Sequence, residues 1–175
     1  MPTRALHVEA DHGRLAGGRT GGLLDGRRSA VPAARADRRG TLLRAKLRGF
    51  SQVPPVLSPA TGRFVARLSE DAIEYELTYR NLSSDAFAAH MHFGHPTDNG
   101  GILVFLCGGN DKPACPLRGG TVRGTIRAAD VLAIPEQGVA AGDGSALLRI
   151  IRAGLAYVNV HTQNFPDGEI RGQIR

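Results

Sequence analysis

The chain has 175 residues, of which 42% are hydrophobic, 22% charged and 5% aromatic, and this composition suits one domain with a flanking segment. The longest apolar run, residues 102–107, is far shorter than the roughly 20 residues of a membrane-spanning helix, so no transmembrane segment is expected. The net charge of +6 does not indicate nucleic-acid binding, because residues 1–40 hold eight arginines against four acidic residues, whereas residues 41–175 hold fourteen basic and twelve acidic residues with the signs interspersed.

Residues 1–40 are rich in arginine, glycine and alanine and contain no aromatic residue. No apolar face here can offset the backbone entropy lost on folding, about 1 to 2 kcal/mol per residue, so we expect disorder. The segment has the basic residues of a secretory signal peptide but lacks its apolar stretch. Two interpretations stay open: the protein is exported by another route, or the true translation start lies downstream.

The remaining residues, 41–175, form short segments of alternating polar and apolar residues separated by turn residues, which predicts antiparallel sheet. Two of these segments, 62–68 and 72–80, are expected to pair as a hairpin around Glu70 and Asp71. The two prolines at 54 and 55 exclude their segment from the centre of a sheet, because proline cannot donate to the ladder. The expected strands are residues 42–47, 62–68, 72–80, 86–93, 102–106, 120–126, 157–162 and 169–174.

One helix is expected among these strands. Ser145 is a suitable N-cap, Leu147, Ile150 and Ile151 recur at helical spacing, and Gly154 marks the end. Many short strands with a single helix predict an all-β fold, an antiparallel Greek-key sandwich or barrel.

Three histidines are the candidate metal ligands. Alternation places His90 and His92 on one face of their strand, and His161 falls on the polar face of another strand together with Tyr157 and Asn159. Three converging imidazoles would suit copper or zinc. The alternative is that these histidines only make hydrogen bonds to Asn159, Glu169 or the backbone.

The last expected strand carries Glu169 and Arg171 on one face, near the histidines. We expect a surface salt bridge or cross-strand hydrogen bonds there, contributing about 0 to 1 kcal/mol if exposed. The competing interpretation makes Arg171 a guide for anions approaching the histidines.

Cys107 and Cys115 are the only cysteines, and a loop of seven residues separates them. An even count and a short connector favour a disulfide, which would stabilise the fold by about 2 to 3 kcal/mol and would imply export. Two reduced thiols in a cytosolic protein are the alternative.

The order of motifs resembles the CHRD domain, the repeat named after chordin and also found alone in bacterial proteins. The resemblance covers residues 42–175 and rests on segments 47–56, 90–94, 157–162 and 165–173. It implies an extracellular or envelope module with an immunoglobulin-like, all-β barrel.

The same domain is faintly similar to copper/zinc superoxide dismutases, through His90, His92 and the pair Val160-His161. This similarity implies a mononuclear copper or zinc site at most, because too few histidines remain for the second metal of a dismutase. It also implies that Arg171 corresponds to an anion-guiding arginine.

Two functions from different classes follow. The first is an exported, monomeric, non-enzymatic module of the secreted or envelope fraction, which binds an extracellular protein or envelope ligand and no nucleic acid. The second is a copper- or zinc-binding domain with a redox or metal-storage role that uses His90, His92 and His161.

Overall fold

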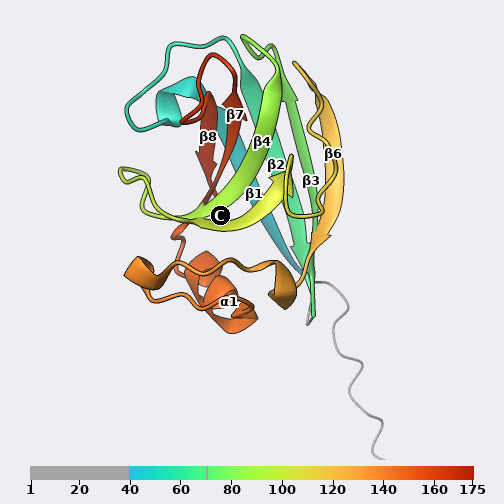
Figure 1. Cartoon of the computed structure of the whole chain (residues 1–175), viewed down its shortest axis with the longest axis vertical. Helices are drawn as coiled ribbons and strands as arrows, with labels where there is room; N and C mark the ends of the chain where they lie inside the picture. The colour runs from blue at the N-terminus through green and yellow to red at the C-terminus, as the bar shows by residue number, and fades with distance from the viewer. Residues whose placement is uncertain (1–39, 70) are drawn as a thin grey trace, which may run out of the picture. The chain divides into compact units, whose positions relative to one another are not determined.

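The computed structural model describes residues 40–69 and 71–175, so the disorder expected for residues 1–40 falls, apart from Gly40, outside the described part. The described chain forms one antiparallel sheet with strand order β5-β4-β7-β8-β1-β2-β3-β6 (Figure 1). The helical elements are η1 (Gly49–Ser51), η2 (Ala128–Asp130), η3 (Pro135–Gln137) and α1 (Gly144–Arg152). The strands are β1 (Thr41–Arg48), β2 (Thr61–Leu68), β3 (Ile73–Arg80), β4 (Ala86–Phe93), β5 (Ile102–Cys107), β6 (Gly120–Ile126), β7 (Ala156–Thr162) and β8 (Ile170–Gln173).

This sheet curls into a nearly closed barrel, which confirms the expected all-β class (Figure 1). The expected hairpin is also confirmed, because β2 and β3 pair along their whole length from Thr61↔Arg80 to Leu68↔Ile73. The connections from β3 to β4 and from β6 to β7 pass to strands that are not adjacent, as Greek-key connections do. Alternate residues of β3 point into the core, where they are almost fully buried: Ile73, Tyr75, Leu77 and Tyr79.

The half of the barrel that holds the candidate site is buried on both faces. Every residue of β7 is buried, including the polar side chains of Asn159 and His161. Loops cover the outer face of these strands: the Asn99 amide donates to the Val53 carbonyl, and Ser58 donates to Glu169. The polar layer of β4 and β7 is therefore an interior layer.

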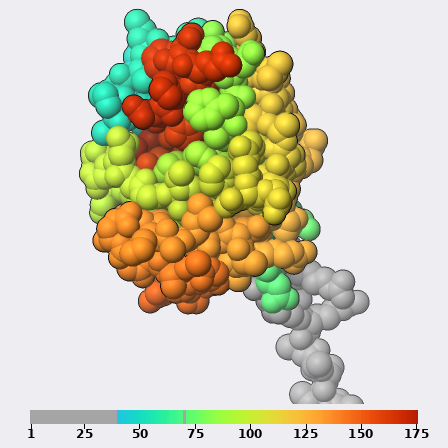
Figure 2. All heavy atoms as spheres, in the orientation of Figure 1, coloured from blue at the N-terminus to red at the C-terminus, as the bar shows by residue number. Residues whose placement is uncertain are grey.

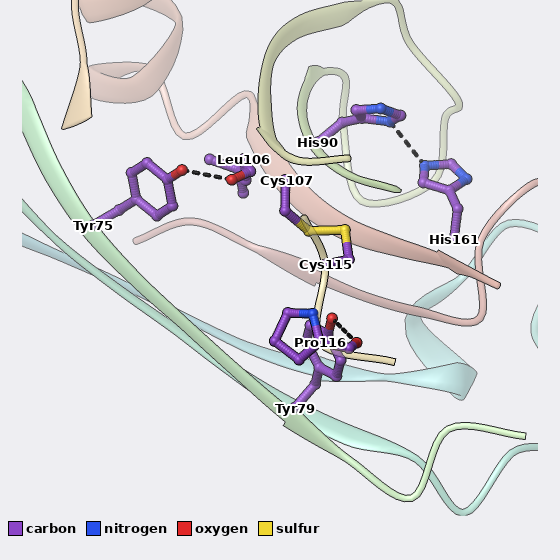
Figure 3. Close-up of a disulfide and its surroundings, with 8 residues drawn as sticks. All are labelled: Tyr75, Tyr79, His90, Leu106, Cys107, Cys115, Pro116 and His161. Atoms are coloured by element: carbon purple, nitrogen blue, oxygen red, sulfur yellow. Dashed lines mark hydrogen bonds between the residues drawn. A yellow bond between two sulfur atoms is a disulfide. The ribbon is translucent and has the colours of Figure 1, made fainter. Parts of the chain in front are cut away.

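Tyrosine side chains bridge the seam between the end strands β5 and β6, which share no ladder in the described part. Tyr75 donates to the Leu106 carbonyl and Tyr79 to the Pro116 carbonyl, on either side of the disulfide (Figure 3). Gly124 lies opposite Tyr75, and a Cβ there would lie 2.4 Å from the tyrosine hydroxyl. The glycine thus makes room for the ring, and the Tyr75 hydrogen bond gives a partner to one backbone carbonyl on the open edge of β5.

Replacing Tyr75 by phenylalanine is expected to lower the free energy of unfolding by about 1 to 2 kcal/mol, because the buried hydrogen bond across the seam is lost. Burial raises the pKa of Tyr75 to about 12, so the hydroxyl stays a donor at neutral pH. Urea unfolding followed by circular dichroism measures the change. Ser69→Ala removes a hydroxyl–carbonyl bond that is exposed, so it should change stability by less than about 0.5 kcal/mol. Equal effects of the two substitutions would contradict the role of the seam.

Helix α1 begins one residue before the expected N-cap, so the assignment of Ser145 as the cap is wrong. The N-cap is Asp143, whose carboxylate accepts hydrogen bonds from the Ala146 amide and from the Ser145 hydroxyl. These hydrogen bonds hold the pKa of Asp143 below its ordinary value. The helix packs Ala146, Leu147, Ile150 and Ile151 into the core. Figure 2 shows the segment around α1, in orange, gathered at one end of the barrel.

Candidate metal centre

The structure brings His90, His92 and His161 together. His90 and His92 lie two residues apart on β4, and β7 pairs with β4 so that His161 lies opposite Ala88. One ring nitrogen of each histidine lies within 4.8 Å of the other two. The closest pair is His90 Nδ1 and His161 Nε2, which are 3.0 Å apart (Figure 3). Three potential ligand atoms from two neighbouring strands therefore share one small volume.

Backbone carbonyls fix which nitrogen of each ring carries the proton. His161 Nδ1 lies 2.7 Å from the Pro166 carbonyl oxygen, and His92 Nδ1 lies 3.0 Å from the Gly100 carbonyl oxygen. Since a carbonyl only accepts, both Nδ1 atoms carry hydrogen and both Nε2 atoms keep a lone pair. His161 Nε2 then accepts a hydrogen bond from His90 Nδ1, which leaves His90 Nε2 with its lone pair. Carbonyl partners of this kind also orient the histidines of metal sites.

The three histidines are buried, with exposed fractions of 6%, 6% and 8% for His90, His92 and His161. Burial lowers the pKa of His90 to about 3, with smaller contributions from His161 and His92, and burial lowers the pKa of His92 to about 4. Burial also lowers the pKa of His161. All three rings are consequently neutral at pH 7, the form that binds metals.

Two buried nitrogens of this cluster have no hydrogen-bond partner. They are the Nε2 atoms of His90 and His92. A buried polar atom without a partner typically costs about 1 to 3 kcal/mol. Asn159 Oδ1, on the strand next to them, is also unpartnered. The cluster thus contains electron-pair donors that make no hydrogen bond of regular geometry in the described chain, although the Asn159 side chain lies close enough to His92 to raise its pKa.

Aromatic rings hold the histidines in place. The His90 ring meets the edge of Phe105 with centroids 4.3 Å apart, and the His92 ring stacks on Tyr157 at 4.8 Å with an interplanar angle of 3°. The Arg171 guanidinium carbon lies 3.4 Å from the centre of the Tyr157 ring. Tyr157 therefore links the last strand to the histidine cluster.

Arg171 is a structural residue here. Its side chain is 1% exposed and donates hydrogen bonds to the His95 and Asp98 carbonyls and to Asn99 Oδ1. These contacts fix the loop that presents the Gly100 carbonyl to His92. The expected surface salt bridge is wrong, because the strand that carries it is covered by this loop. Arg171 donates these hydrogen bonds to the loop, so the structure gives no support to an anion-guiding role.

Glu169 is also fully buried and forms no ion pair with Arg171. Its carboxylate accepts hydrogen bonds from the Ser58 hydroxyl, the Ser83 amide and hydroxyl, and the Thr162 hydroxyl. It joins three segments that are distant in sequence. The expected hydrogen-bonding role is therefore correct, but the partners Ser58 and Ser83 lie in loops, where alternation gives no signal.

Gln52 is another residue near the site that the sequence did not indicate. It is 5% exposed, and its Nε2 atom is buried without a partner. Gly168 lies against it with a φ of +119°, and a Cβ there would lie 2.3 Å from Gln52 Nε2 and 2.8 Å from Asn159 Nδ2. The Asp-Gly turn before β8 thus makes room for two amide side chains beside the histidines.

The structure contains a disulfide between Cys107, at the end of β5, and Cys115 (Figure 3). The short loop between them folds back on itself through a hydrogen bond from the Gly108 amide to the Pro113 carbonyl. Disulfides persist in oxidising compartments, so this bond fits an extracellular protein. Within the described residues, no helix has the length and apolar content needed to cross a membrane.

Comparison with known proteins supplies the family. A family model described as the CHRD domain matches residues 43–174, which is almost all of the described chain. Neither a curated protein nor a solved structure matches the chain. The match contains all eight strands except the first two residues of β1, together with the three histidines and both cysteines. The chain belongs to the CHRD-domain family.

Proposed function

We propose that this domain binds one transition-metal ion, copper or zinc, through His90, His92 and His161. The observation that carries the proposal is the convergence of three buried, neutral imidazoles with two unpartnered Nε2 atoms among them. The pair of histidines on β4 and the single histidine on β7 supply nitrogen ligands of the kind that zinc and copper prefer. Three protein ligands would leave a coordination position open.

The chemistry of the ligand set agrees with this proposal. Zinc–nitrogen bonds of about 2.0 to 2.1 Å place the ligand atoms of a tetrahedral site about 3.3 Å apart. The nitrogens here lie within 4.8 Å of one another, so modest ring rotations would complete the set. The His90–His161 hydrogen bond would be exchanged for bonds to the ion, because His161 Nε2 has a single lone pair. Copper bound there would supply redox chemistry, and zinc would supply Lewis-acid chemistry.

Metal titration of chelator-treated protein tests the proposal. The full chain is expected to bind one equivalent of Zn²⁺ or Cu²⁺, and His92→Ala is expected to weaken binding at least about 100-fold, because loss of a ligand should exceed the effect of losing an outer-shell partner. His95→Ala is the matched control, because His95 is exposed and lies outside the cluster. Calorimetry gives the stoichiometry, and electron paramagnetic resonance of the Cu²⁺ form reports nitrogen ligands.

The result that contradicts this proposal is equally direct. Folded protein that takes up no stoichiometric metal would remove the proposed site, and so would a His92→Ala variant that binds as tightly as the wild type. Circular dichroism of each variant verifies that the domain is folded.

A second function is the binding or scaffolding role of an exported, non-enzymatic module that recognises an extracellular protein or envelope ligand. The family and the disulfide support this proposal, since both fit an extracellular protein. The three histidines are buried, so a metal ion held by them does not exclude recognition of a partner at the surface.

A further inference from the structure

A groove of about 1210 Å³ runs over the face of the barrel formed by β8, β1, β2 and β3. Seven of its nineteen lining residues are arginine or lysine, and none is aspartate or glutamate. None of the three histidines lines it, although Gln52 and Arg171, which lie beside the candidate metal centre, do. Six of these cations are exposed, and the five that lie on β1, β2 and β3 are called the basic face below: Arg44, Lys46, Arg48, Arg63 and Arg80.

Strand geometry gathers these cations on one face. Along β1, the basic side chains alternate with the buried residues Leu43, Ala45 and Leu47, so all of them point outward. Sheet register then adds the neighbouring strands, because Lys46 lies directly opposite Arg63. Charges that are interspersed along the sequence are therefore segregated in space, which the sequence expectation of a nearly neutral body did not include.

The basic face has no internal charge compensation in the described chain. The ion pairs among described residues join Arg118 to Asp85, Arg123 to Glu76 and Lys112 to Asp130, and none includes a residue of the basic face. Like charges directly opposite each other on a sheet are destabilising. Such an arrangement is accounted for by a ligand that carries negative charge.

We propose that the basic face binds an acidic polysaccharide. The proposal goes beyond the metal site and deepens the second function, since it names the class of envelope ligand. Arg44 and Arg48 are about 14 Å apart along the strand, at roughly 3.4 Å per residue, so the face matches an extended chain with repeated anionic groups. Arginine forks suit carboxylate and sulfate groups. Phe50 lines the groove with 71% of its surface exposed, where its ring can pack on the apolar face of a sugar.

Two other occupants fit less well. Single-stranded nucleic acid is usually held by several aromatic side chains that stack on successive bases, whereas Phe50 is the only exposed aromatic residue among those that line the groove. Residues 1–40 of this chain hold eight arginines against four acidic residues, so their charge repels the face. Since the disulfide and the family fit an extracellular protein, an anionic glycan is the polyanion best matched to that compartment.

Binding of the full chain to immobilised polygalacturonate and dextran sulfate tests the proposal. We expect salt-sensitive binding that the double substitution Lys46→Gln and Arg63→Gln weakens roughly tenfold, as two lost ion contacts would. The double substitution Arg149→Gln and Arg152→Gln on α1 causes the same change in net charge outside the groove, and it should leave binding unchanged. Unfolding curves of each variant verify the fold.

Three results would overturn the proposal. The first is failure of the wild-type protein to bind either polysaccharide at low salt. The second is equal weakening by both double variants, which would indicate attraction by net charge alone. The third is tighter binding of single-stranded DNA than of either polysaccharide, which would assign the face to nucleic acid. Substitution of His92 should not alter polysaccharide binding, so failure of the metal proposal is distinguishable from failure of this one.

Discussion

Replacement of Glu169 by alanine is expected to lower the free energy of unfolding by about 2 to 3 kcal/mol, because hydrogen bonds to a charged group contribute about 1.5 to 3 kcal/mol. The carboxylate is fully buried and collects four hydrogen bonds from serine and threonine groups. Its removal leaves the donors of Ser58, Ser83 and Thr162 without their shared acceptor. Only the Thr162 hydroxyl is fully buried, where an unpaired donor costs about 1 to 3 kcal/mol, whereas water can reach the donors of the half-buried Ser58 and the exposed Ser83.

The physical reason for so large an effect is that one side chain joins three segments. Ser58 belongs to the loop between η1 and β2, Ser83 to the loop between β3 and β4, and Thr162 to the end of β7. The neighbouring residue His161 depends on the same turn, because its Nδ1 donates to the Pro166 carbonyl. Loss of Glu169 should therefore loosen one support of the histidine cluster as well as the fold.

Urea unfolding followed by tyrosine fluorescence measures this change, since the chain has three tyrosines and no tryptophan. Glu74→Ala removes an exposed carboxylate on β3 and should alter stability by less than about 0.5 kcal/mol. Glu169→Gln keeps one acceptor oxygen and should fall between the two. A Glu169→Ala variant as stable as Glu74→Ala would mean that the hydrogen-bond hub contributes nothing.

The histidine cluster could be anticipated from the sequence because strand alternation has a period of two. The spacing of His90 and His92 places both rings on one face, and the pattern around His161 separates it from Val158 and Val160 in the same way. What alternation does not report is what covers a face. Loops bury these rings on the polar side of the sheet, which alternation does not indicate.

The burial of Arg171 is likewise not predicted by strand alternation. Its place in an alternating strand indicates an outward side chain, and an outward arginine is usually exposed. Here the loop of residues 95–100 lies over it and accepts its hydrogen bonds. Contacts of that kind join residues more than 70 positions apart, and no local pattern encodes them.

The basic face and the N-cap of α1 could be predicted only in part from the sequence. The sequence of β1 shows that its basic residues share one face. Their proximity to the cations of β2 depends on the register of the two strands, which pairs Lys46 with Arg63. The sequence indicates Ser145 as the N-cap of α1, two residues after the observed N-cap Asp143, because aspartate and serine are both good capping residues. Only the backbone geometry decides between them.

Acidification of the metal-free domain from pH 6.5 to pH 5 is expected to reduce the free energy of unfolding by about 3 kcal/mol. In the folded state the pKa values of His90 and His92 are lowered to about 3 and about 4, whereas in the unfolded chain they return to about 6.5. Below pH 6.5 the unfolded chain binds protons that the folded chain does not, so acid favours unfolding. Each histidine contributes about 1.4 kcal/mol per pH unit once it is protonated in the unfolded state.

The pH window follows from those values. Above pH 7 both states are neutral at these positions, so stability should not depend on them. Below pH 6.5 the loss accumulates until the folded rings themselves take up protons, near pH 4 for His92 and near pH 3 for His90. His161 acts in the same direction, because burial lowers its pKa too. Restricting the comparison to pH 5 and above avoids most of the titration of ordinary carboxylates.

Urea unfolding at pH 7.5, 6.5 and 5.0 measures the slope, and the double variant His90→Gln/His92→Gln should flatten it because two titrating groups are gone. His95→Gln, which removes an exposed histidine, should keep the wild-type slope. Zinc at about 100 times its dissociation constant should add about 2.7 kcal/mol at neutral pH if it binds the folded state alone. Acid should diminish that gain, because protons compete for the same nitrogens. A wild-type domain whose stability stays constant from pH 6.5 to pH 5 would show that the three rings are not held neutral, and the metal proposal would lose its preformed ligands.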